Sequence, residues 1–167
     1  MNTNRRSFLV GGTAVLAIGA AAFALRPMGA TRAAEGNFEI ALTYAEWQGK
    51  LTPEQFAVLR QEGTERPFTS PLLDEHREGT FVCAGCDLPL FASATKYDSG
   101  TGWPSFYTFI DGGIGDSEDT TLGMSRTEVH CSRCGGHQGQ VFDDGPQPTG
   151  LRYCINGVSL KFEPKTA

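Results

Sequence analysis

Five cysteines constrain this chain of 167 residues most strongly, because four come in pairs and one stands alone. Cys83 and Cys86 form one Cys-x-x-Cys motif, Cys131 and Cys134 form a second, and Cys154 has no such partner. Two such motifs can supply the four thiolates of a tetrahedral zinc site, because two intervening residues let a tight turn direct both sulfur atoms at one ion. Four soft thiolates that leave no open position favour structural over catalytic zinc.

Two disulfide bonds are the alternative for the four paired cysteines, since exported proteins commonly contain them. A disulfide within one Cys-x-x-Cys motif closes a strained, reducible ring, so such dithiols are usually redox sites or metal ligands. A redox dithiol is expected at the start of a helix in a βαβ unit, and neither motif lies in such a setting. The choice between zinc and disulfides stays open on these motifs alone.

Residues 1–34 have the features of a twin-arginine export signal. Arg5 and Arg6 precede an apolar stretch that is rich in Gly and Ala and short for a membrane span. An uncleaved membrane anchor is the alternative. We expect cleavage near residue 34, a periplasmic or otherwise exported protein without stable membrane insertion, an N-terminal extension at 35–50 and one domain at 51–167.

The charge of the chain argues against nucleic acid as a partner. The formal net charge is −5, and because residues 1–34 contain four arginines and no acidic residue, the rest of the chain has a formal net charge of −9. Such a chain is repelled by phosphate backbones, and no basic patch with interleaved aromatic residues is present. We therefore expect a domain that does not bind nucleic acid. Separately from this charge argument, we expect the domain to be a monomer.

The sequence predicts two helices followed by short strands. Thr52, Pro53 and Gln55 form a strong helix start, and Thr43 with Glu46 forms a weaker one. Beyond residue 79, short apolar runs alternate with Gly, Pro, Asp and Asn, which predicts strands at 80–82, 88–91, 105–109, 127–130, 140–142, 151–155 and 158–162. The dipeptide at 156–157 predicts a tight hairpin between the last two strands, and the Gly-rich acidic segment 111–119 predicts a surface loop.

A strand over 151–155 would place Cys154 between two polar side chains. Because side chains alternate along a strand, Arg152, Cys154 and Asn156 would share one face, and Tyr153 and Ile155 the other. A neighbouring arginine favours thiolate and would lower the pKa of the thiol from about 8.5. The pattern is that of a nucleophile, although a buried, inert cysteine fits the local sequence equally well.

His137 and Trp103 are two further candidates for the site. His137 follows the second cysteine motif, but four thiolates already complete a tetrahedral shell, so a proton-donating or hydrogen-bonding role fits it better than metal binding; a solvated loop histidine is the alternative. Trp103 lies in a turn between Gly102 and Pro104. It could cover the core, or it could form the wall of a small pocket for a methyl group or sulfur.

Four strings, in order between about residues 51 and 162, resemble the type B methionine-R-sulfoxide reductase family: GTERPF at 63–68, SGTGWPSF at 99–106, RTEV at 126–129, and the segment 144–156 that ends in RYCIN. The resemblance implies a mainly β fold of two packed antiparallel sheets with short N-terminal helices. It also implies structural zinc on Cys83, Cys86, Cys131 and Cys134, at a distance from the active site.

The resemblance implies that Cys154 attacks the sulfur of methionine sulfoxide in oxidised proteins or peptides and becomes a sulfenic acid. His137 would hydrogen-bond or protonate the sulfoxide oxygen, and Arg152 and Asn156 would assist the thiolate. Trp103 would hold the methyl group of the substrate. The remaining substrate-binding residues would be Gln140 and Phe142.

The chain departs from this family at two positions. Thr101 stands where many relatives have a resolving cysteine, so we expect a thioredoxin-like protein or a small thiol to reduce the sulfenic acid. A cysteine released from the zinc site is the alternative. Gln140 stands where relatives usually have a second histidine, and because an amide cannot release a proton at neutral pH, more of the proton transfer would fall to His137. The alternative function is a zinc-clipped binding module in which Cys154 is inert.

Overall fold

The computed structural model describes residues 36–119 and 126–166. The predicted export signal at 1–34 lies outside the described residues and stays a prediction. Among the helices that are described, none is both long and apolar enough to cross a membrane.

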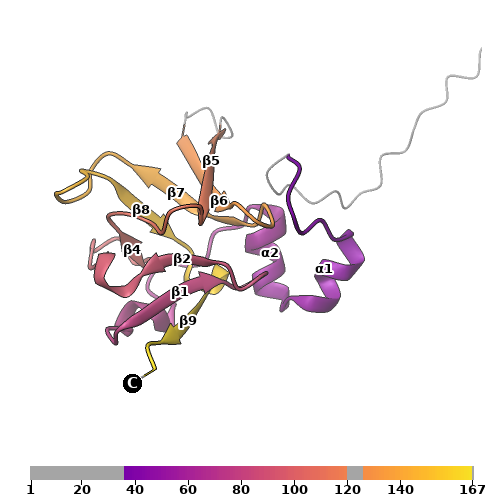
Figure 1. The fold of residues 1–167 in the computed structure, drawn as a ribbon, viewed down its shortest axis with the longest axis horizontal. Coiled ribbons are helices and arrows are strands. Elements are labelled where there is room, and N and C mark those ends of the chain that lie inside the picture. Colours follow the sequence, from indigo (N-terminus) through magenta and orange to yellow (C-terminus); the bar gives the residue numbers. More distant parts are fainter. Residues whose placement is uncertain (1–35, 120–125, 167) are drawn as a thin grey trace, which may run out of the picture.

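Two short helices precede the strands, and each starts where its capping residues predict. Helix α1 (Tyr44–Lys50) begins at Thr43, whose side chain accepts from the N–H of Glu46, and α2 (Pro53–Gln61) begins at Thr52, whose side chain accepts from the N–H of Gln55. In both helices the third residue bonds back to the cap, so two backbone donors are satisfied at each start. Figure 1 shows both helices at one end of the strands.

The strands of the described residues form two antiparallel sheets. The smaller sheet has the order β2 (Pro89–Ala92), β1 (Gly79–Cys83), β9 (Leu160–Pro164). The larger has the order β3 (Lys96–Tyr97), β4 (Ser105–Phe106), β8 (Arg152–Ile155), β7 (His137–Phe142), β6 (Arg126–Cys131), β5 (Ile114–Asp119). This arrangement confirms the predicted mainly β fold of two antiparallel sheets with short N-terminal helices.

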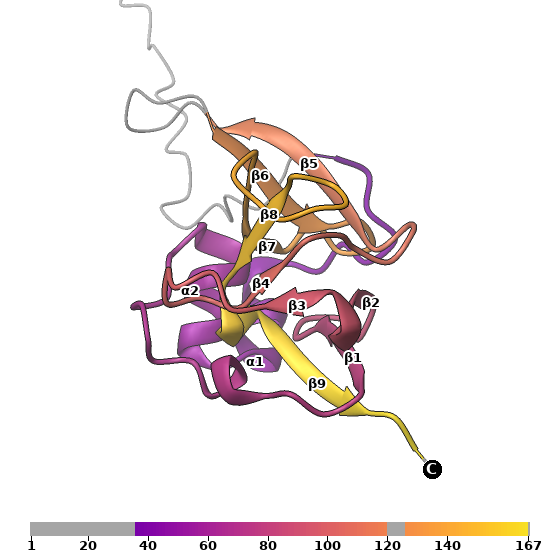
Figure 2. The same ribbon diagram turned by 90° about the vertical axis from the view of Figure 1, so that its left-hand side faces the viewer.

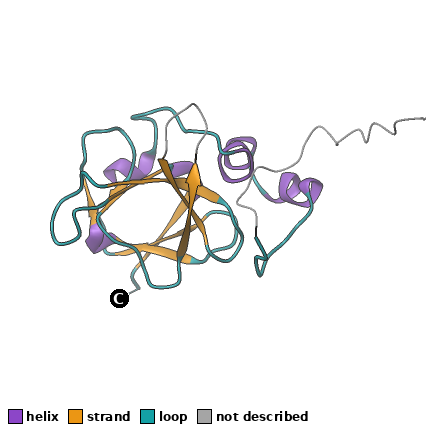
Figure 3. Ribbon diagram, turned by 90° about the horizontal axis from the view of Figure 1, so that it is seen from above, coloured by secondary structure: helices purple, strands orange, loops and turns teal. Residues whose placement is uncertain are grey.

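An aromatic core fills the space between the two sheets. Seen from above, the strands surround a common interior (Figure 3). Phe91 stacks on Phe106 with 4.3 Å between ring centres, and Phe81 meets Phe106 edge-on at 5.1 Å. Tyr153 and Ile155 of β8 are buried in the same core. The alternation along β8 is therefore as predicted, and it leaves Arg152 and Cys154 on the opposite face.

Two segments differ from the sequence prediction. The acidic segment predicted to be a loop contains β5, which pairs along its length with β6. No tight hairpin forms after β8, because Asn156 has an ordinary φ of −65° and a 3₁₀ turn (Gly157–Ser159) follows it. The chain then crosses to β1 of the smaller sheet instead of returning along β8, as Figure 2 shows. The sequence also missed the short strand β3, and β4 is shorter than predicted.

Candidate active site and metal site

The four paired cysteines meet at one point, although they come from distant parts of the chain. Their sulfur atoms all lie within 4.8 Å of one another, with 3.8 Å between Cys83 and Cys134 and 3.5 Å between Cys86 and Cys131. Both distances far exceed the S–S bond of about 2.05 Å in a disulfide. A tetrahedral ion with Zn–S bonds of about 2.3 Å has S···S edges of about 3.8 Å, so the spacing fits a metal tetrathiolate.

Electrostatic repulsion within the cluster also favours a bound cation, since the four sulfur atoms lie within 4.8 Å of one another. Four thiolates this close repel one another, and a metal ion removes that repulsion by binding all of them. The cluster of buried cysteines can therefore hold a metal ion.

A buried arginine and a glutamine contact this cluster, and the sequence analysis predicted neither contact. The side chain of Arg60 in α2 donates to the Cys134 carbonyl at 2.8 Å and lies over the Trp47 ring at 3.7 Å, with the residue only 3 % exposed. Gln138 donates to the Cys83 sulfur at 3.5 Å. The available signal for Arg60 was its position four residues after the apolar Phe56, which places both on one helix face.

A second site is a cavity of about 330 Å³ on the outer face of β8. It brings together six of the seven residues predicted for catalysis and substrate binding: Cys154, Arg152, Asn156, Trp103, Gln140 and Phe142. Thr64, Thr101 and Arg126 complete its lining. The four metal-site cysteines do not line it, which agrees with the expectation that metal site and active site are separate.

The register of the larger sheet explains why these residues meet. Ser105 of β4 lies opposite Cys154, Cys154 lies opposite Gln140 of β7, and Gln140 lies opposite Glu128 of β6. Residues directly opposite one another in a sheet project from the same face. Gln140 is therefore the neighbour of the Cys154 thiol, although the two are far apart in the sequence.

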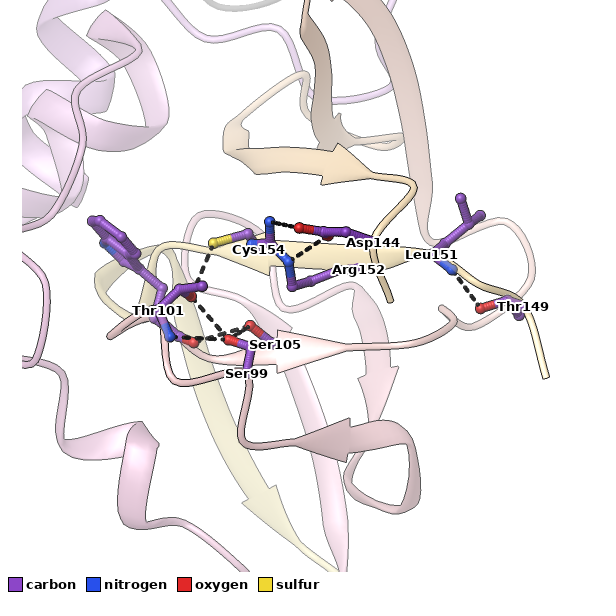
Figure 4. Close-up of polar contacts among 9 residues, drawn as sticks. Ser99, Thr101, Ser105, Asp144, Thr149, Leu151, Arg152 and Cys154 are labelled. Atoms are coloured by element: carbon purple, nitrogen blue, oxygen red, sulfur yellow. Dashed lines mark hydrogen bonds and ion pairs between the residues drawn. The ribbon is translucent and has the colours of Figure 1, made fainter. Parts of the chain in front are cut away.

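Arg152 lies beside Cys154, but its guanidinium is paired with a carboxylate. Its guanidinium makes two hydrogen bonds to Asp144, at 2.7 and 2.8 Å (Figure 4). It also stacks over the Phe142 ring at 4.3 Å. Burial raises the pKa of the Cys154 thiol, and this outweighs the hydrogen bond from Thr101 and the charge of Arg152, which both lower it. Arg152 therefore lowers the pKa of Cys154 as expected, but burial makes the net shift upward, which the sequence did not predict.

We expect replacement of Arg152 by methionine to raise the pKa of Cys154 further, since it removes a nearby cation. Alkylation by iodoacetamide at about pH 8, below that pKa, requires the thiolate, so its rate should fall by up to about tenfold, which is one pKa unit. The matched control is Arg152→Lys, which keeps the positive charge, so its alkylation rate should fall less than that of Arg152→Met. Equal alkylation rates in all three proteins would contradict this account.

His137 is the predicted catalytic residue that does not line the cavity. It begins β7 at 2 % exposure, and its Nδ1 lies 2.7 Å from Oε1 of Glu128. The other carboxylate oxygen, Oε2, accepts from the Ser117 hydroxyl at 2.6 Å. Burial opposes ionisation of Glu128, but the bonds from His137 and Ser117 outweigh it and hold its pKa below the usual value. The direct role of His137 in protonating the sulfoxide stays a prediction without a contact to support it.

Comparison with known proteins connects this geometry to a family. Residues 51–164 match the family model described as the SelR domain. The curated "Peptide methionine sulfoxide reductase MsrB" of Leptospira interrogans is 55 % identical over 128 residues, which is 76 % of this chain and 98 % of the relative. The chain belongs to the MsrB family. The proteins of that name from Pseudomonas putida and Methanosarcina barkeri are each 57 % identical, over 74 % and 71 % of this chain and 93 % and 84 % of their own lengths.

In this MsrB-family chain, hydroxyl groups lie beside the Cys154 thiol. The Thr101 hydroxyl lies 3.9 Å from the Cys154 sulfur and 2.8 Å from Ser99, and Ser99 lies 2.7 Å from Ser105 (Figure 4). Among the described residues, every other cysteine belongs to the buried four-cysteine cluster. No second thiol of the described chain is therefore placed to form a disulfide with Cys154.

Proposed function

We propose that this chain reduces methionine-R-sulfoxide in peptides to methionine, with Cys154 as the nucleophile. The observation that carries the proposal is the place of Cys154: in a chain of the MsrB family, its half-buried thiol faces a cavity that Trp103 and Phe142 also line. Such aromatic faces suit the methyl group and sulfur of the substrate. The preference for the R epimer follows from the resemblance to type B reductases.

In the first step, the Cys154 thiolate attacks the sulfoxide sulfur and forms an S–S bond while the oxygen takes up a proton. The hydroxyl group then moves to the Cys154 sulfur as its bond to the substrate sulfur and the S–S bond both break. The sulfoxide gains two electrons and leaves as a thioether, while Cys154 loses two electrons and becomes a sulfenic acid. The oxygen must be protonated to leave, because oxide is a poor leaving group. Gln140, opposite Cys154 in the sheet, can donate a hydrogen bond to that oxygen but cannot supply the proton itself.

Asn156 positions neighbouring groups in this account. Its Oδ1 accepts from the N–H of Glu65 at 2.8 Å, and its Nδ2 donates to the carbonyl of Gln138 at 3.0 Å. The carbonyl of Glu65 in turn accepts from the indole N–H of Trp103 at 2.9 Å. Asn156 thereby connects the end of β8 to the aromatic wall of the cavity, which supports a positioning role.

An external thiol completes the cycle. A first thiol condenses with the sulfenic acid, which releases water and leaves a mixed disulfide on Cys154; a second thiol then displaces Cys154 as free thiol. Thr101 in the place of a resolving cysteine supports this route. The reductant would be a thioredoxin-like protein or a small thiol.

Zinc is the proposed ion of the four-cysteine cluster, in a structural role. Sulfur distances close to a tetrahedral edge and the absence of another donor class support zinc. A divalent ion bound by four thiolates keeps a net negative charge, and buried Arg60 can offset it. When bound, the ion would join the end of β1 to the end of β6.

Turnover of the two sulfoxide epimers tests the proposed function. With dithiothreitol as reductant, the chain should convert a peptide that contains methionine-R-sulfoxide and leave the same peptide with the S epimer unchanged. Chiral separation of the remaining sulfoxide measures both at once. Equal conversion of the two epimers, or conversion of neither, would refute the assignment.

A further inference from the structure

Phe68 is an exposed aromatic residue held in a backbone conformation that bulky residues avoid. Its φ is +63°, and the residue is 71 % exposed. Bulky residues are genuine outliers in this region and adopt this conformation only where the surrounding structure enforces it. Because the ring is exposed, burial of its apolar surface does not offset the backbone strain in the free chain.

The neighbouring segment fixes this conformation. The N–H of Phe68 donates to the carbonyl of Gly102 at 2.8 Å. Gly102 has a φ of +92°, and a Cβ added there would lie 2.9 Å from two atoms of the Phe68 ring. Only a glycine lets the ring come this close. Phe68 is thus held against the loop that carries Trp103.

A second cavity, of about 440 Å³, lies beside this ring, and Trp103 belongs to both cavities. Phe68, Gly102 and Tyr97 are among the residues that line it. Charged side chains line it as well, Asp74 and Lys96 among them. The Trp103 side chain, whose indole N–H donates to the Glu65 carbonyl, lines both this cavity and the Cys154 cavity.

We propose that this second cavity binds the polypeptide segment next to the oxidised methionine, with Phe68 as its main contact. The inference rests on the proposed function and adds a docking site to it. A peptide whose sulfoxide reaches Cys154 must leave the Cys154 cavity past its lining residues. One of these is Trp103, which also lines the second cavity. A rigid aromatic side chain gives a large contact area with little loss of conformational entropy on binding.

The test compares two substrates that differ only in their flanking residues. N-acetyl-methionine-R-sulfoxide amide fills the Cys154 cavity alone, whereas a short peptide with a central methionine-R-sulfoxide also reaches Phe68. Phe68→Asn removes the ring, and asparagine tolerates positive φ, so the loop should keep its shape. We expect KM for the peptide to rise about tenfold, the loss of one good contact, with kcat for both substrates and KM for the small one unchanged.

The matched control is Leu42→Asn, which removes another exposed apolar side chain and should change neither substrate. Unchanged kinetics of Phe68→Asn on the small substrate also show that the variant is folded. An equal loss on both substrates, or no change on either, would overturn the docking site and leave the proposed function standing. Failure of the unsubstituted chain on both R-sulfoxides would overturn the proposed function and this inference with it.

Discussion

Replacing Cys154 by serine should abolish sulfoxide reduction, with a loss of about a thousandfold or more in turnover. A serine hydroxyl does not ionise near neutral pH and cannot take up the sulfoxide oxygen as a sulfenic acid. The cavity and its lining should stay in place, because serine is close to cysteine in size. Dithiothreitol-driven conversion of a methionine-R-sulfoxide peptide measures the effect.

The four cysteines of the metal cluster provide the control for this substitution. They lie outside the Cys154 cavity, so Cys154→Ser should keep the metal content and melting temperature of the unsubstituted chain. Activity that survives in Cys154→Ser would show that another group reduces the sulfoxide. The alternative of an inert Cys154 in a binding module predicts no activity in either protein.

Replacing Cys131 by serine should remove the metal and unfold the domain. Structural zinc contributes about 10–16 kcal/mol of binding free energy in small zinc domains, which exceeds or matches the net stability of about 5–15 kcal/mol of a typical protein. Cys131 also ends β6 and is fully buried, so its loss should destabilise the ends of β1 and β6, which the cluster brings together. Metal analysis, together with thermal unfolding followed by circular dichroism, measures both effects.

Cys154→Ser again serves as the matched variant, since it removes one thiol without touching the cluster. An unsubstituted chain that contains no metal and has two disulfides would contradict the metal site. So would a Cys131→Ser protein that melts at the temperature of the unsubstituted chain. A chelator should unfold the unsubstituted chain and leave its thiols free.

Features set by neighbouring residues could be predicted from the sequence. Both capping boxes depend on residues three apart, and the alternation from Arg152 to Asn156 depends only on strand geometry. Strand β5 could not be predicted, because its glycine and acidic residues have low strand propensity and it is stabilised by pairing with β6. The path after Asn156 was also missed, since bonds to distant Glu65 and Gln138 hold that residue in an extended conformation.

The electrostatics of the site depend on contacts that local sequence does not reveal. Asp144 forms an ion pair with Arg152, and burial decides that the pKa of Cys154 is raised. Glu128 pairs with Nδ1 of His137, the residue that the sequence motif had suggested for proton transfer. Pairing and burial are decided by the tertiary fold, so residue types could be identified from the sequence while their chemical states could not.

A single turnover without added reductant tests the central claim most directly. The chain is mixed with excess methionine-R-sulfoxide peptide, and both methionine formation and the mass of the Cys154 peptide are followed. The account predicts one methionine per chain and one added oxygen atom on Cys154, trapped as a sulfenic acid adduct. Methionine formed without oxidation of Cys154, or oxygen found on another residue in its place, would contradict it.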